Sequence, residues 1–370
     1  MSGGGLHPPP TSASRGERAP AEPAASRGSA AADQDEREER PERETEPGSG
    51  ARERAHRFRD RAFVAAIHGA RRMLRALGVA RSLRIADAIG RLLDLVLIGP
   101  RRLSLEHLEL ALPELPAAER RRIVRDMFRG VARSGVEVLL LDDIAARLSE
   151  HVDIEGGDVM ADLLARGRGV VAITGHIGNW ELLAAAVARV GFPVTAVATP
   201  VKGERLNAEN IALRERVGVE TIVQRGSESW RAILRTLRRG RILAAVMDQD
   251  TRGQAVFVPF FGRPARTPVG PAVLVLRTGA AALGAFIHRE ADGRHRVTLR
   301  EIALPPLPPE GAREARDDWL VETTARFNAA IEAEVRRRPD EWVWWHRRWR
   351  ERPSRIVGMR SRIGKSSNSQ

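Results

Sequence analysis

The chain contains no cysteine among its 370 residues. It therefore forms no disulfide, offers no thiolate nucleophile and supplies no cysteine ligand to a metal. A Gly-x-Ser-x-Gly motif is absent as well, so no serine nucleophile of the hydrolase type is indicated. The sequence thus shows neither of the common signs of a covalent acyl-enzyme.

Long uncharged apolar runs are also missing. A helix that spans a bilayer needs about 20 consecutive apolar residues. Ile85–Ile98 comes nearest, and Asp87, Arg91 and Asp94 interrupt it. Met1–Pro10 lacks the basic and apolar blocks of a secretory signal. We therefore expect any contact with a membrane to be peripheral.

Positive charge is what the chain has in excess. The formal net charge is +13, and residues 1–55 hold eight Arg against eleven acidic residues, which leaves +16 for the rest. A body this basic attracts nucleic acid, acidic membrane surfaces or an acidic carrier protein. Residues 1–55 are rich in Pro, Gly, Ser and charge, so we expect a disordered tail. A folded domain over 56–350 and a basic tail over 351–370 are predicted to follow.

Apolar periodicity predicts helices first and an α/β arrangement later. Residues 57–77 place apolar side chains on one helical face with arginines around it, a pattern typical of helices that lie on anionic bilayers. A second helix is predicted over 117–141. Short apolar runs then alternate with helical segments, so the fold class is α/β, a mixed central sheet flanked by helices. The predicted strands are 170–174, 194–198, 220–223, 242–247, 281–287 and 294–302, and the predicted later helices are 180–190, 204–217, 230–239 and 313–338.

The segment Val170–Glu181 is the most informative part of the chain. A predicted strand ends at Thr174, two glycines permit a tight turn, and a helix follows. His176 then lies at the carboxyl end of a strand, where open α/β sheets bind ligands. Glu181, in the first helical turn, is predicted to accept a hydrogen bond from the imidazole, so that His176 can act as a general base on an alcohol.

The same His-x4-Glu spacing recurs at His346 and Glu351, without a strand or a turn before it. We therefore expect His346→Ala to be harmless. Apolar residues over 256–261 and 269–276 are candidates for an acyl-chain groove. Near the C-terminus, Trp342, Trp344, Trp345 and Trp349 alternate with arginines. Such a cluster favours a membrane interface, whereas no nucleic-acid recognition motif accompanies it.

Asp248 and Asp250 follow the predicted strand 242–247, so at least one of them should face the same cleft as His176. Their Asp-x-Asp spacing leaves a second function open, a metal-dependent glycosyltransferase in which both carboxylates hold the ion. A third alternative is a non-catalytic module that binds membranes or a carrier protein.

Four segments resemble, in order, the lipid A biosynthesis acyltransferases of the lauroyl and myristoyl type. The central one is Gly-His-Ile-Gly-Asn-Trp-Glu over 175–181, and the others are Leu103–Leu115, Asp248–Pro268 and Pro339–Trp349. The resemblance covers about residues 57–350.

That resemblance implies an O-acyltransferase with His176 and Glu181 as its catalytic pair and functional roles for Arg214 and Asp250. It implies an acyl carrier protein or acyl-CoA as the donor and a lipid A-type glycolipid as the acceptor. It implies no cofactor and no metal, and a peripheral place on the cytoplasmic face of the inner membrane.

Overall fold

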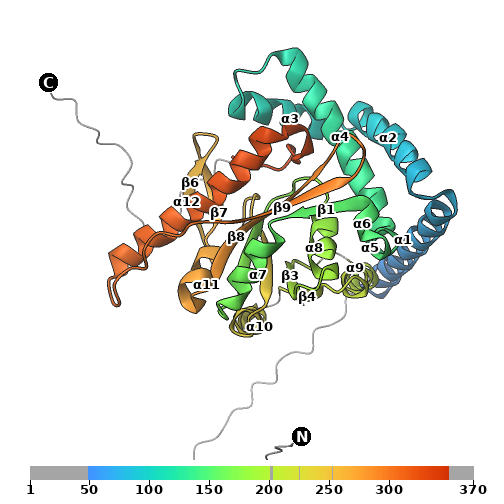
Figure 1. The fold of residues 1–370 in the computed structure, drawn as a ribbon. Helices are drawn as coiled ribbons and strands as arrows, with labels where there is room; N and C mark the ends of the chain where they lie inside the picture. Colours follow the sequence, from blue (N-terminus) through green and yellow to red (C-terminus); the bar gives the residue numbers. More distant parts are fainter. Residues whose placement is uncertain (1–48, 201–202, 225, 252, 350–370) are drawn as a thin grey trace, which may run out of the picture. The chain divides into compact units, whose positions relative to one another are not determined.

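The computed structural model describes residues 49–349, except 201–202, 225 and 252. From Gly50 onward the described residues belong to one compact unit (Figure 1). The predicted tails over 1–55 and 351–370 lie largely outside the described residues. Residues 49–55 are already part of the first helix.

Six helices precede most of the sheet. They are α1 (Ser49–Leu77), α2 (Val79–Val96), α3 (Ile98–Ala111), α4 (Ala117–Leu139), α5 (Leu141–Ala146) and α6 (Leu148–His151). Helices α2 and α4 pack side by side (Figure 1). The long helix predicted from residue 117 is confirmed as α4.

Part of α1 is packed on the protein, while Phe63 of its apolar face keeps 55% of its surface exposed. Leu74 is buried, Arg71 pairs with Asp142, and Arg75 donates from Nε to Asp143 over 2.6 Å. These arginines therefore fasten α1 to α5. Reversing their charge would break intramolecular ion pairs, so it would not test membrane binding.

The described residues contain a seven-stranded mixed sheet, which confirms the predicted fold class. Strands β1 and β9 run antiparallel to the other five. From edge to edge the strands are β1 (Val152–Glu155), β9 (His295–Glu301), β8 (Ala281–Arg289), β2 (Val170–Thr174), β5 (Ile242–Val246), β3 (Val194–Ala198) and β4 (Glu220–Val223).

Helices cover both faces of this sheet. Alternate residues of β2 point to opposite sides, so they contribute to two different cores. Val171 and Ile173 join a core with α10, α11 and α12, whereas Val170 and Ala172 join a core with α5, α7 and α8 (Figure 1). The bounds are α7 (Gly157–Ala165), α8 (Trp180–Arg189), α9 (Glu204–Arg216), α10 (Gly226–Arg238), α11 (Gly270–Thr278), α12 (Arg313–Arg337) and the 3-10 helix η1 (Pro339–Glu341).

A separate hairpin lies against α12. It consists of β6 (Ala255–Phe260) and β7 (Arg263–Pro268). Phe261 and Gly262 both have positive φ, 52° and 68°, as a tight two-residue hairpin turn requires. Val258 and Phe260 point into the core, so this part of the predicted acyl groove is core packing.

Candidate active site

His176 is held in a turn between β2 and α8. Strand β2 ends at Thr174, and Asn179 caps α8 by accepting a hydrogen bond from the Leu182 N–H over 3.0 Å. The Asn179 amide also donates to buried Glu137 over 3.0 Å. The turn is thus fixed from both sides, and the His176 side chain keeps 21% of its surface exposed.

The partner of His176 is Asp248, which follows β5. His176 Nδ1 lies 2.7 Å from Asp248 Oδ1, and the His176 backbone N–H donates to Oδ2 over 2.7 Å. Trp342 Nε1–H donates to the same Oδ2 over 2.7 Å. Strands β2 and β5 are parallel neighbours, so their carboxyl ends bring the two residues together. A side chain at Gly175 would meet Asp248 Oδ2 at 3.0 Å, which explains the glycine there.

Asp248 is fully buried, yet it is held ionised. Burial raises its pKa, but the charge and hydrogen bonds of His176 and the hydrogen bond from Trp342 outweigh it, so the net pKa shift is downward. A carboxylate only accepts hydrogen bonds, so His176 Nδ1 carries the proton. The lone pair of His176 is therefore on Nε2, where a general base needs it.

Glu181 lies in the first turn of α8, as predicted, but its partner is not His176. In the part of the chain that the structure describes, its carboxylate pairs with Arg214, which donates from Nε over 2.9 Å and from Nη2 over 2.6 Å. This hydrogen bonding raises the pKa of Arg214. The predicted hydrogen bond from His176 to Glu181 is wrong, because Asp248 fixes the imidazole from the β5 side. Catalytic roles for Glu181 and Arg214 stay predictions.

Asp250 pairs with Arg266 on β7. Its Oδ1 accepts from Arg266 Nη1 over 3.1 Å, and Arg266 also donates to the Gly253 carbonyl. One aspartate after β5 does face His176, but it is Asp248 and not the Asp250 that the family resemblance suggested. A functional role for Asp250 stays a prediction.

His346, which sequence reasoning set aside, packs against His176. The two ring centroids are 4.7 Å apart and the rings are nearly perpendicular, at 81°. Burial, followed by the charge of His176, lowers the pKa of His346 to about 4, so this imidazole is neutral at pH 7. A backbone pairing brings the segments of the two histidines together. Ile177 forms an isolated antiparallel β-bridge with Trp342, and the Val343 N–H donates to the His176 carbonyl over 3.2 Å.

Gln249 lies between the two histidines. Its Nε2 is 3.3 and 3.2 Å from the ring nitrogens of His176 and 3.0 and 3.1 Å from those of His346. Gln249 Nε2 is thus about equally far from both nitrogens of each ring, so its amide group lies against both imidazoles.

Part of the tryptophan cluster belongs to the core. Trp342 and Trp344 are fully buried, and so is Arg348, which donates to the Arg266 carbonyl and to Thr267, each over 2.7 Å. Trp345 and Trp349 are partly buried and Arg347 is exposed, so the membrane interface expected for this cluster stays a prediction.

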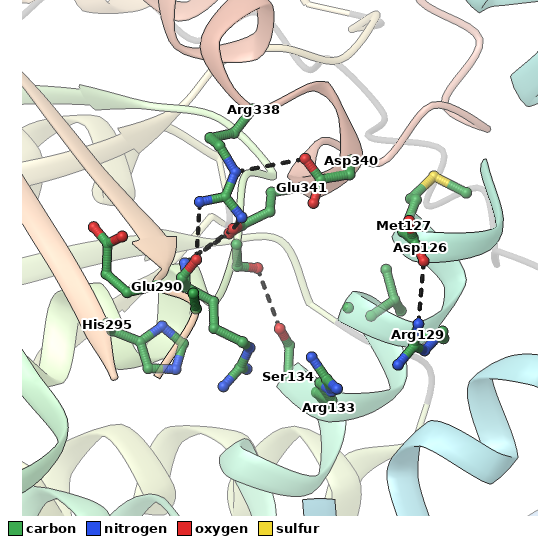
Figure 2. Close-up of a pocket in the computed structure, with 15 residues that line it drawn as sticks. Asp126, Met127, Arg129, Arg133, Ser134, Glu290, His295, Arg338, Asp340 and Glu341 are labelled. Carbon is green, nitrogen blue, oxygen red and sulfur yellow. Dashed lines mark hydrogen bonds and ion pairs between the residues drawn. The ribbon is translucent and has the colours of Figure 1, made fainter. Parts of the chain in front are cut away.

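A pocket of about 500 Å³ lies between α4, η1 and the turn from β8 to β9 (Figure 2). Gly178, two residues after His176, lines it together with residues of α4 and η1. Its charges are largely paired with one another: Arg338 contacts Asp340 over 3.5 Å, and Arg129 contacts Asp126 over 3.2 Å (Figure 2). Ser134 donates to the Gly178 carbonyl over 3.3 Å, which ties the pocket to the His176 turn.

The three residues that could hold a metal ion are the same active-site groups. Among the described residues, His176, Asp248 and His346 bring ligand atoms within 4.8 Å of one another. Asp250 is not among these three residues.

Comparisons with known proteins show the family to which the chain belongs. A family model described as bacterial lipid A biosynthesis acyltransferase matches residues 52–351. Phosphatidylinositol mannoside acyltransferase of Mycobacterium tuberculosis (H37Rv) is 33% identical over 200 residues, 53% of this chain and 63% of the relative. That of Mycolicibacterium smegmatis is 32% identical over 149 residues, 40% of this chain and 49% of the relative. The chain thus spans between half and two thirds of these relatives. Lipid A biosynthesis palmitoleoyltransferase of Escherichia coli K12 is 28% identical over 253 residues, 67% of this chain and 78% of the relative.

Proposed function

Because the chain belongs to the bacterial lipid A biosynthesis acyltransferase family, we propose that it transfers a fatty acyl group from an acyl thioester to a hydroxyl of a glycolipid. The observation that carries the proposal is the His176–Asp248 pair at the ends of β2 and β5, in which the carboxylate holds Nδ1 of His176. A buried carboxylate that orients a histidine is the arrangement that a general base for an alcohol needs.

The proposed reaction is a direct transfer. The acceptor hydroxyl gives its proton to His176 Nε2 while its oxygen bonds to the thioester carbon. The carbonyl pair moves onto oxygen and forms a tetrahedral oxyanion. The oxyanion collapses as the C–S bond breaks, and His176 returns the proton to the departing sulfur. Asp248 stabilises the imidazolium between these steps.

The oxyanion needs N–H donors, and the turn N–H groups and the guanidinium nearest to hand already donate elsewhere. The backbone N–H groups of His176 and Gly178 donate to Asp248 and to the Glu341 carbonyl, and Arg214 donates to Glu181. The N–H groups of His346 and Gln249 lie next to His176 instead. A neutral imidazole is a suitable donor to an oxyanion, as the low pKa of His346 allows.

His346→Ala is therefore expected to lower kcat by about 10²-fold, the usual effect of removing one oxyanion donor. His346→Gln keeps an N–H donor and should recover part of the loss. Steady-state kinetics of both variants check this. Equal activity of His346→Ala and the unchanged protein would restore the earlier expectation that His346 is dispensable.

Donor and acceptor are proposed from charge and from the relatives. A body with net charge +16 suits an acidic acyl carrier protein, and it suits the phosphates of acyl-CoA almost as well. The relatives are named for lipid A and for phosphatidylinositol mannosides, both glycolipids. We therefore propose a glycolipid acceptor, with a lipid A-type precursor as the first candidate, and a site of action on the cytoplasmic face of the inner membrane.

Metal dependence separates this proposal from the glycosyltransferase alternative. An imidazole base and a thiol leaving group need no Lewis acid, whereas a departing diphosphate does. We expect purified protein to transfer acyl groups equally well with and without excess EDTA, as measured by mass spectrometry of the lipid product. Loss of activity in EDTA and its recovery with Mn²⁺ would contradict the proposed mechanism.

A further inference from the structure

Helix α2 packs on the protein with its small and polar side. Ser82, Ala86, Gly90 and Asp94 repeat every four residues and are all buried. Gly90 is where the two helices are closest, because a Cβ there would lie 2.5 Å from the Cα of Arg129 on α4. The inner face of α2 is therefore a ridge of small residues that lets α4 approach.

Leu83 and Leu93 pack partly on the core, but most of the large aliphatic side chains of α2 point outward. This exposed face, here called the α2 surface, continues through Leu97 into the start of α3. Leu95 and Ile98 keep 68% and 74% of their surface exposed. Its members are Ile85, Ile89, Leu92, Leu95, Val96, Leu97 and Ile98.

This arrangement is the reverse of a helix at a water-exposed surface, which buries its large apolar residues and exposes its polar ones. An exposed apolar patch of this kind marks a binding surface. Small residues at a helix contact, with aliphatic residues outside, are typical of helices whose outer face meets lipid.

The charges around the α2 surface indicate what it meets. Arg81, Arg84 and Arg91 on α2 are exposed, and so is Arg102 on α3. The acidic residues of α2 are turned inward instead. Asp87 is paired with Arg133 over 2.6 Å, and buried Asp94 is paired with Arg101 over 3.4 Å. The rim is therefore cationic and lacks exposed carboxylates between residues 79 and 102.

We propose that the α2 surface docks the protein on an anionic lipid bilayer, with α2 lying in the headgroup plane. The aliphatic side chains enter the boundary of the acyl chains, and the arginine rim contacts anionic headgroups. None of the described helices is long and apolar enough to cross a membrane, in keeping with a helix that lies flat.

The choice of a lipid over a protein partner rests on the proposed function, and charge supports it independently. A second copy of this chain would bring the same arginine rim against itself, because the faces of a twofold contact are identical. Anionic headgroups supply the missing negative charge.

Vesicle flotation tests this docking without measuring acyl transfer. The probes are phosphatidylcholine vesicles and vesicles in which part of the lipid is phosphatidylglycerol. The full chain should float with the anionic vesicles, and high salt should weaken this binding. Leu92→Asp with Leu95→Asp should reduce the bound fraction at least about tenfold, because two charges would enter the acyl region.

The matched control is Leu307→Asp, an equally exposed leucine at 62% that lies outside the α2 surface. It should bind vesicles like the unchanged protein. Both variants should keep the unchanged thermal midpoint, since the replaced side chains face solvent. Binding that survives in the double variant, or equal loss in the control, would overturn the proposal. So would a protein that ignores vesicles but dimerises through this face, as seen by light scattering of the same variants. An inactive enzyme that still docks would refute only the proposed function.

Discussion

His176→Ala is expected to lower kcat for acyl transfer by about 10³-fold or more, because loss of a general base alone is worth about 10²–10⁴. The imidazole is the proposed base and is oriented by the buried carboxylate, and its removal also leaves Asp248 charged without its main partner. Steady-state kinetics with a saturating acyl thioester measure the effect. KM for the donor should change much less than kcat.

The control for this variant is His68→Ala. His68 is half exposed on α1 and pairs with Glu209 over 3.3 Å. It should leave kcat within about twofold, as expected of surface changes away from the site. A similar loss in both variants would show that histidine removal acts through folding and not through catalysis.

Asp248→Asn is expected to have the second largest effect, about 10³-fold on kcat. The amide has nearly the same shape, but it can donate to Nδ1 and so favours the tautomer with its proton on Nε2, where no base remains. Asp250→Asn is the matched change two residues away, at a carboxylate paired with Arg266. The fold-loss in kcat of Asp250→Asn should be at least about tenfold smaller than that of Asp248→Asn.

Parallel kinetic assays of the two asparagine variants decide between the aspartates. If Asp250→Asn were the more damaging, Asp248 would be a structural residue, and the assignment made from its hydrogen bonds would be wrong.

Much of the fold could be predicted because its signals are local. Strand β2 consists of five consecutive buried residues bounded by glycines, and α8 and α9 end within a residue of their predicted limits. Strand β1 was missed because only Val152 of its four residues is buried. The β6–β7 hairpin was missed because Pro259 and Pro264 break the usual strand pattern, although its turn is regular.

The candidate site could be predicted only in part, because its contacts join distant segments. His176 followed from a strand, a turn and a helix that are adjacent in sequence. The choice of Asp248 over Asp250 depends on how the chain leaves β5, and side chains two residues apart beyond a strand end follow no fixed periodicity. The place of His346 depends on the bridge from Ile177 to Trp342, which no local pattern encodes.

The orientation of α2 also could not be predicted from the sequence. Residues 85–98 were read as an interrupted apolar run, and their charges argued against a spanning helix. Only the packing on α4 shows that the small residues face inward and the aliphatic ones outward. Periodicity alone would have placed the large residues in the core.

The most direct test of the central claim is mass spectrometry of a complete reaction. Purified protein is mixed with an acyl thioester and a glycolipid acceptor, and the lipid, the released thiol and the intact protein are all measured. The account predicts one new acyl ester per thiol released, no acylated protein at any time, and almost no product with His176→Ala. A stable acyl-protein adduct, or product formation that does not depend on His176, would contradict it.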